Sequence, residues 1–195
     1  MNNNQYLVHR RNRIKQRLRI RLGVLQMIHK PLLNLLLLPI VVGTVFIWIK
    51  KDIVIKFFNI SQLLFLIYKY IIIILAILLP LLFIFALIEA IGNATAKQDE
   101  ADLQEAFERQ ELRNGHPILM DKKRVNGSNV TMREFYSNIP MKTWVEKQEN
   151  IADAMNVHFV ESLRYGGKSN GKRIVIHTAP GREMTTRGNL YDDEI

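Results

Sequence analysis

The strongest pattern in the chain is a wholly apolar stretch at residues 70–88, with the sequence YIIIILAILLPLLFIFALI. As a helix, a stretch of this length would extend about 28 Å, close to the ~30 Å hydrocarbon core of a bilayer. A helix on the surface of a soluble protein keeps one polar side, which this stretch lacks. Pro80 near its middle would kink a membrane helix without breaking it. The pattern predicts a membrane-spanning helix.

A second uncharged stretch, PLLNLLLLPIVVGTVFIWI at residues 31–49, predicts another span. Trp48 lies at its far end, where an amphipathic ring suits the membrane interface. The stretch is not typical of a cleavable signal peptide, because a long basic region precedes it and no small-residue cleavage pattern follows. Residues 50–69 join the two spans, and their apolar content predicts a short segment on the outer membrane surface. Residues 31–91 are therefore expected to form a two-span helical hairpin.

Residues 1–30 form a basic juxtamembrane segment with eight Lys or Arg and no Asp or Glu. Part of it alternates charged and apolar residues as a strand would, but Ile14, Leu18, Leu22 and Leu25 have helical spacing. We favour a helix, because the segment has no partner strand and runs directly into a membrane helix. The candidate contact residues are seven of its cationic side chains: Arg10, Arg11, Arg13, Lys15, Arg17, Arg19 and Arg21.

Three interpretations of this basic segment remain open. A basic amphipathic helix beside a span is typical of contact with anionic lipid headgroups. The charges would also suffice as a topology signal alone. The third hypothesis is direct contact of these charges with nucleic acid.

The distribution of Lys and Arg predicts the orientation of the spans. The N-terminal flank carries eight of these residues and the connecting loop carries four, and the larger count stays in the cytoplasm. Because two spans return the chain to the same side, we expect both termini to be cytoplasmic in a cell-membrane protein. Residues 98–195 carry 14 Lys or Arg and 16 Asp or Glu, so the basic character belongs to the N-terminus and not to the C-terminal domain. The chain has no cysteine, which excludes disulfides and thiolate metal sites.

The part after the spans predicts one small cytoplasmic α+β domain. Residues 92–115 read as a charged linker helix that Gly115 ends, and residues 116–195 as the domain itself. Asn126-Gly127 favours a hairpin with short strands, and Pro140 begins an amphipathic helix. Residues 157–165 and 173–179 then read as a β-hairpin about the turn at residues 166–171, whose apolar face the helix would cover. The fold class is thus a two-span α-helical membrane hairpin followed by a small α+β domain.

No motif in this domain predicts catalysis. Residues 166–172 (GGKSNGK) have the spacing of a phosphate-binding loop, but Arg173 stands where Ser or Thr must bind magnesium, and the segment lies between two strands. His158 and His177 could approach each other across the hairpin, yet no third metal ligand is near. We therefore expect no enzyme, no cofactor and no metal, and cannot name a partner-docking residue.

Three short motifs carry a resemblance. These are FERQEL at residues 107–112, IADAMN at residues 151–156 and IVIHTAPGR at residues 174–182, placed after a basic N-terminus and two spans. This layout resembles the membrane-proximal N-terminal region of FtsK/SpoIIIE-type DNA translocases, the TcpA-like coupling proteins of conjugative elements. The family's ATPase motor, with its Walker motifs, is absent from this sequence. The resemblance implies a portion that cannot hydrolyse ATP alone, and no catalytic residue is carried over.

Two hypotheses for function follow. In the first, the chain is a membrane-anchored, non-catalytic adaptor of a DNA-transfer translocase, and its partners are the bilayer together with motor or secretion-channel subunits. In the second, it is a two-span membrane-anchored regulator or sensor whose cytoplasmic domain binds a ligand or another protein. A homo-oligomer is compatible with both. The sequence leaves open whether the chain is a truncated translocase or a stand-alone protein.

Overall fold

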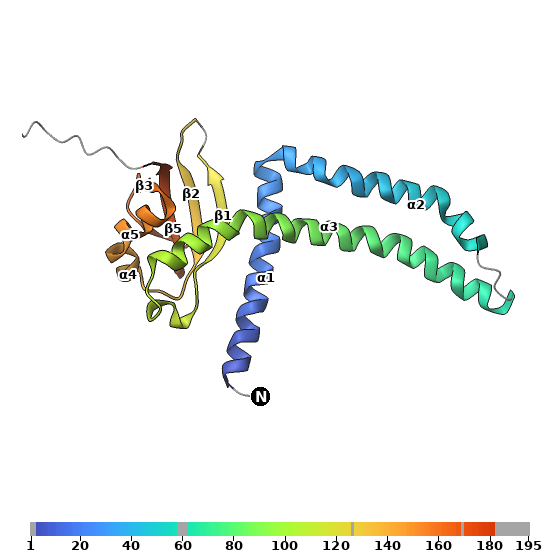
Figure 1. Cartoon of the computed structure of the whole chain (residues 1–195), viewed down its shortest axis with the longest axis horizontal. Helices are drawn as coiled ribbons and strands as arrows, with labels where there is room; N and C mark the ends of the chain where they lie inside the picture. The colour runs from blue at the N-terminus through green and yellow to red at the C-terminus, as the bar shows by residue number, and fades with distance from the viewer. Residues whose placement is uncertain (1–2, 58–61, 126, 169, 182–195) are drawn as a thin grey trace, which may run out of the picture. The chain divides into compact units, whose positions relative to one another are not determined.

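The computed structural model describes residues 3–57, 62–125, 127–168 and 170–181 (Figure 1). The chain divides into two compact units, Met1–Lys97 and Gln98–Ile195, called here the helical unit and the sheet unit. The division falls within one helix, α3 (Gln62–Ala106).

The helical unit consists of long helices. Helix α1 (Asn3–His29) carries the basic segment and is followed by the 3₁₀ helix η1 (Pro31–Leu37). Helix α2 (Leu38–Phe57) and the first part of α3 (Gln62–Ala106) are the two apolar helices. The regions Pro31–Lys51 and Leu64–Ala106 are long and apolar enough to cross a membrane, as judged by length and composition. In the most apolar window of each, none of the residues of the first and 6% of those of the second are buried.

The helical unit differs from the sequence-based prediction in where its helices end. The segment expected to join the spans is largely helical, because α2 continues to Phe57 and α3 begins at Gln62, with residues 58–61 outside the described part. No break separates the second span from the predicted linker helix. Helix α3 runs unbroken through Pro80 to Ala106, so the charged residues 97–106 extend the apolar helix. The rest of the predicted linker contains the short 3₁₀ helix η2 (Glu111–Asn114).

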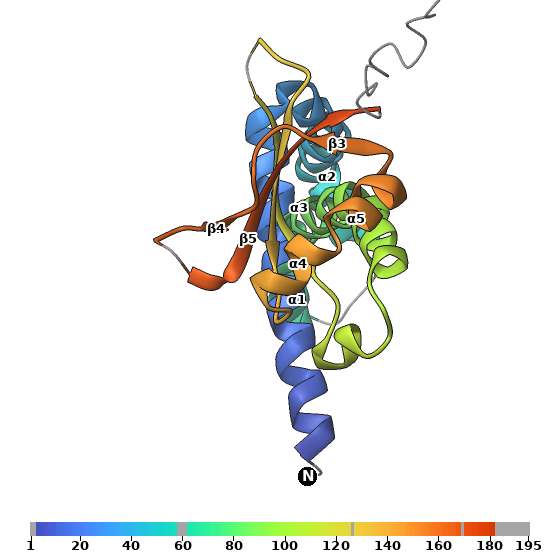
Figure 2. The same ribbon diagram turned by 90° about the vertical axis from the view of Figure 1, so that its left-hand side faces the viewer.

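The sheet unit contains an antiparallel sheet with the order β1-β2-β5-β3, in which β4 also pairs with β5. Its strands are β1 (Ile118–Arg124), β2 (Thr131–Tyr136), β3 (Val157–Phe159), β4 (Arg164–Gly166) and β5 (Asn170–Pro180). Helices α4 (Met141–Glu146) and α5 (Gln148–Met155) lie between β2 and β3 in the chain. Figure 2 shows the β4–β5 hairpin extending away from these helices. Two long apolar helices and a small domain with an antiparallel sheet are therefore confirmed.

One face of the sheet supplies the core of the sheet unit. Phe135 pairs with Leu119 on one side and with Ile174 on the other, so these three fully buried side chains share that face. Trp144 of α4 covers it, with its ring 5.7 Å from that of Phe135 and 5.0 Å from that of Phe107, which follows α3. Its indole N–H donates to the Ser137 hydroxyl at 3.2 Å. The predicted amphipathic helix therefore covers the sheet, although it is divided into α4 and α5.

The sequence-based prediction located both hairpins, but not the extent of their strands or the pairing in the second one. Strand β4 ends at Gly166 and β5 begins at Asn170, so both strands extend into the predicted turn at residues 166–171, of which residue 169 lies outside the described part. Arg164 pairs with Val175, whereas pairing symmetric about the predicted turn would place it opposite Arg173. The predicted strand at residues 157–165 is divided into β3 and β4. Val160 still donates its N–H to the His177 carbonyl (2.9 Å), but the chain then leaves the sheet at residues 161–163 before β4 begins. The Asn126-Gly127 hairpin has longer strands than expected, and β2 lies between β1 and β5.

Candidate functional site

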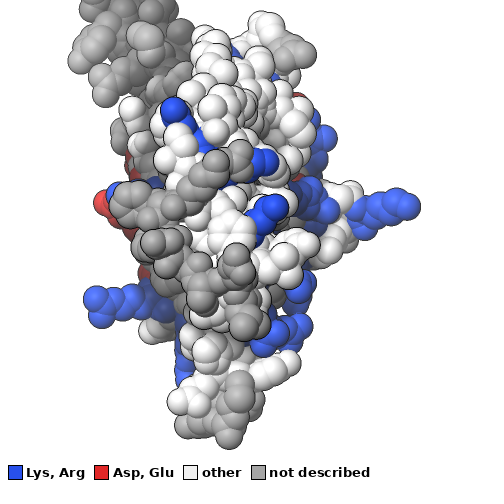
Figure 3. All heavy atoms as spheres, turned by 90° about the vertical axis from the view of Figure 1, so that its right-hand side faces the viewer, with Lys and Arg blue, Asp and Glu red and all other residues white. Residues whose placement is uncertain are grey.

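The seven candidate cationic residues all lie on α1, in three kinds of environment. Five are exposed: Arg10, Arg13, Lys15, Arg17 and Arg21. Arg11 is half-buried, and Arg19 is only 4% exposed. Arg19 therefore belongs to the packing of the helix and not to its outer surface. Figure 3 shows Lys and Arg side chains projecting at several places on one face of the molecule, with little Asp or Glu in view.

Four of the exposed arginines form one stripe along α1. Arg10, Arg13, Arg17 and Arg21 are separated by three, four and four residues, which places them on one side of an α-helix. We call these four residues the arginine stripe. Ile14, Leu18 and Leu25 follow the same spacing about a quarter turn away and are half-buried. Helix α1 therefore carries a cationic side next to an apolar side.

Helices α1 and α3 touch through their backbones at two glycines. A Cβ added to Gly23 would lie 2.0 Å from the Ile88 carbonyl oxygen, and one added to Gly92 would lie 2.1 Å from that of Arg19. Both distances are far below van der Waals contact, so only glycine fits at these positions. Leu22 and Ala96 are fully buried around this crossing. The crossing turns the side of α1 that bears Arg19, Leu22, Gly23 and Gln26 toward α3.

In the sheet unit, a buried carboxylate joins the end of α3 to the sheet. The Asp99 carboxylate lies 2.8 Å from Lys122 Nζ on β1 and 3.3 Å from Arg133 Nε on β2. Arg133 also donates to the Thr178 hydroxyl on β5. The Asp99 side chain is 5% exposed, so its charge is compensated by these cations and not by water.

Glu100, next to Asp99 on α3, binds the first strand through its backbone. Its carboxylate accepts the Leu119 N–H at 2.9 Å. Because β1 is an edge strand with β2 on its other side, this N–H would otherwise be available to another chain. Asp99 and Glu100 together fix the last turns of α3 to β1.

A second ion pair lies within the sheet. Arg173 Nε and a terminal nitrogen of Arg173 donate to the two oxygens of Glu134 at 2.6 and 2.7 Å. These hydrogen bonds to the carboxylate raise the pKa of the Arg173 guanidinium above its usual value. Gly166 lies directly beside the pair, where an added Cβ would be 2.2 Å from a Glu134 carboxylate oxygen, so a larger residue there would displace the Glu134 side chain. Arg173, which stands where a phosphate-binding loop needs Ser or Thr to bind magnesium, is thus engaged in a structural ion pair with Glu134.

The two histidines considered as metal ligands have other contacts. His158 Nδ1 lies 2.9 Å from the Gly181 carbonyl, and His177 Nδ1 lies 3.4 Å from the Glu161 carboxylate. Among the residues that the structure describes, no group of three or more potential metal ligands occurs.

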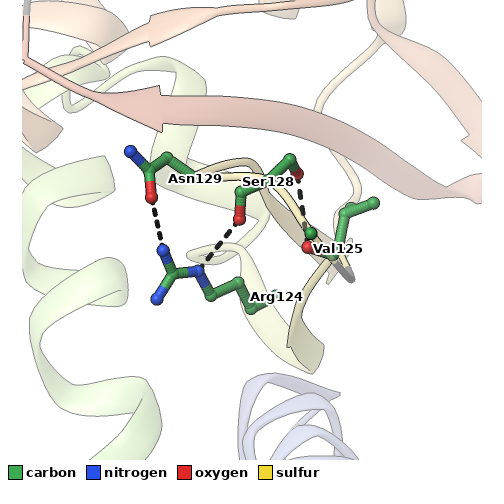
Figure 4. A pocket seen from close by; sticks show the side chains of 5 residues that line it. Arg124, Val125, Ser128 and Asn129 are labelled. Carbon is green, nitrogen blue, oxygen red and sulfur yellow. Dashed lines mark hydrogen bonds between the residues drawn. The ribbon is translucent and has the colours of Figure 1, made fainter.

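The described part of the sheet unit includes two open depressions of interest. Figure 4 shows the first, in the β1–β2 turn, where Arg124 donates to the Ser128 carbonyl at 3.0 Å and to the Asn129 side chain. The turn therefore uses this guanidinium internally. The second is an open groove between α4, α5 and β3, which we call the α5–β3 groove; its lining residues include Val145, Glu149, Ala152, His158 and Phe159. It combines apolar and acidic side chains.

Comparisons with known proteins give one weak similarity to report. No family model matches the chain, and no curated protein matches it. A solved structure described as "Structure of pCW3 conjugation coupling protein TcpA monomer form with ATPgS" aligns at 22% identity with a TM-score of 0.36. The alignment covers 43% of this chain and 23% of that chain, so it spans less than a quarter of the coupling protein. The matched protein is of the kind that the sequence motifs resemble.

Proposed function

We propose that this chain is a two-span membrane protein whose sheet unit docks a partner protein and catalyses no reaction itself. The observation that supports the membrane anchor is the exposure of two long apolar helices. Side chains such as Leu32, Phe46 and Phe83 are 79%, 61% and 61% exposed. Apolar side chains exposed on all sides of a helix are stable in lipid and costly in water.

The proposed partner class comes from the sequence resemblance to the membrane-proximal region of conjugative coupling proteins. In that role the chain would hold motor or secretion-channel subunits of a DNA-transfer machine at the cell membrane, with both termini in the cytoplasm. The many Lys and Arg of residues 1–30 support this orientation.

Two measurements test this function in sequence. The chain should remain in the membrane pellet after an alkaline carbonate wash. Its recovery in the soluble fraction would contradict the proposed membrane anchor. A tagged full chain expressed beside a transfer machinery should then co-purify with its motor, relaxase or channel subunits. Glu149→Lys in the α5–β3 groove should weaken this recovery, whereas Lys142→Gln on exposed helix surface should not.

The second candidate function, a membrane-anchored regulator or sensor, is favoured by the α5–β3 groove itself. The groove is open and lined by mixed apolar and polar residues, which suits a ligand or a peptide. Enrichment of an unrelated regulatory protein, without transfer subunits and with the same dependence on Glu149, would favour this second function.

A further inference from the structure

We propose that α1 lies along the cytoplasmic membrane surface and that its arginine stripe binds the headgroups of anionic lipids. This proposal rests on the two-span anchor proposed above. It assigns a specific ligand class to Arg10, Arg13, Arg17 and Arg21, and it excludes nucleic acid as the ligand of this surface.

The first step of the argument is the direction of α1. Figure 1 shows α1 running across α3 and not alongside it. The crossing lies at Ile88 and Gly92 of α3, where the most apolar run of that helix ends and its charged part begins. If the apolar part of α3 spans the bilayer, a helix that crosses it at this level lies near the headgroups.

The second step is the rotation of α1 about its own axis. The glycine crossing fixes this rotation, because Gly23 and the backbone of Arg19 must face α3. At 3.6 residues per turn, Arg10, Arg17 and Arg21 then lie on the side away from α3, and Arg13 lies beside them. All four side chains are exposed, in agreement with this geometry.

The third step is the choice of ligand. Exposed apolar side chains continue the arginine stripe toward the first span: Val24 is 40% exposed and Ile28 is 67% exposed. Ile14 and Leu18 form a further apolar side next to the stripe. A DNA phosphate backbone would satisfy the arginines but leave Val24, Ile28 and the exposed parts of Ile14 and Leu18 in water. A bilayer surface satisfies both, since apolar groups enter the acyl boundary while guanidinium groups reach phosphates.

The absence of cysteine from the sequence allows a clean test on the full chain. An Ile14→Cys variant, labelled with an environment-sensitive fluorophore, is reconstituted into nanodiscs of phosphatidylcholine alone or mixed with phosphatidylglycerol. We expect a blue shift of the label emission in the anionic discs, which added salt reverses because it screens the charges. Changing all four stripe arginines to Gln should abolish this shift. Nanodiscs expose both membrane faces, so an altered orientation of the variant does not affect the reading.

A matched control removes four cations from the sheet unit. Lys123, Lys142, Lys168 and Lys172 are exposed, and their change to Gln should leave the shift intact. If that variant loses the shift, or if wild-type emission is the same in both kinds of disc, the proposal is overturned. It is also overturned if labelled duplex DNA binds, through the arginine stripe, the chain in phosphatidylcholine discs while anionic lipid leaves the label emission unchanged. If the chain instead fails to enter the discs, the proposed two-span anchor is contradicted, and this proposal fails because it depends on that anchor.

Discussion

At the scale of single residues, Gly92 decides how closely α3 approaches α1. A methyl group there would lie 2.1 Å from the Arg19 carbonyl oxygen, so Gly92→Ala should force the helices apart. Alanine favours a helix over glycine by about 1 kcal/mol, so a loss of packing would not reflect weaker helix formation. Arg19, which is 4% exposed, should become a site of rapid tryptic cleavage in detergent or nanodiscs. Mass spectrometry of the fragments measures this change.

The control for that variant is Gly43→Ala in α2. No atom lies within 4 Å of a Cβ added at Gly43, so this substitution should leave cleavage at Arg19 as slow as in the wild type. Equal cleavage rates in the two variants would contradict the glycine-mediated crossing.

Asp99, near the end of α3, forms the most buried of the described ion pairs, with Arg133. Asp99→Asn keeps the shape of the side chain but removes the charge that compensates Lys122 and Arg133. We expect a loss of about 3 kcal/mol in the unfolding free energy of the sheet unit. Trp48→Phe leaves Trp144, which is fully buried, as the sole tryptophan, so urea unfolding can be followed by its fluorescence. Lys142→Gln, which breaks an exposed pair with Glu146, should cost less than about 1 kcal/mol.

At the scale of elements, the segment after α3 is held to the α4–α5 junction by Glu108 and Lys147, whose charged atoms lie 2.6 Å apart. The hydrogen bond from Lys147 lowers the pKa of Glu108 below its ordinary 4.5. This pair therefore adds stability above the unfolded-state pKa, and the contribution is lost as pH falls through the lower folded-state value. Glu108→Gln should slightly lower the melting temperature at neutral pH and leave it unchanged once the carboxylate is protonated. A constant difference across both pH ranges would contradict the pair.

The elements differ in how far the sequence predicts them. The two apolar helices follow from composition alone, because a long stretch without charge and with few polar residues has no polar side to present to water. The pairing of β2 with β5 does not, since Phe135 and Ile174 are distant in the chain and the turn signals specify only neighbouring strands. The predicted linker helix continues the second apolar helix as far as Ala106, because residues 97–106 are mostly good helix formers.

The candidate site was predictable to a similar extent. The arginine stripe could be recognised from helical spacing, but the burial of Arg19 depends on a crossing between distant segments. The sequence signals for that crossing were Gly23 and Gly92, two glycines inside helical stretches, where a glycine can mark close packing. Asp99, Lys122 and Arg133 lie far apart in sequence and are ordinary surface residue types, so their ion pairs could not be predicted.

At the scale of the whole molecule, the distribution of charge along the chain sets the expected orientation of the proposed spans. The eight cationic residues before the first span outnumber the four between the spans, so a reporter fused after Ile195 should read cytoplasmic and one within residues 50–69 should read external. Changing the arginine stripe to Gln leaves four cations in the N-terminal flank against four in the loop. This variant should therefore insert in both orientations, and each fusion should give a mixed signal. Lys50→Gln with Lys51→Gln widens the original difference and should keep the wild-type pattern. If the stripe variant kept a single orientation, positive charge in the N-terminal flank would not determine the orientation of the spans. The proposed role of the arginine stripe would then be lipid binding alone.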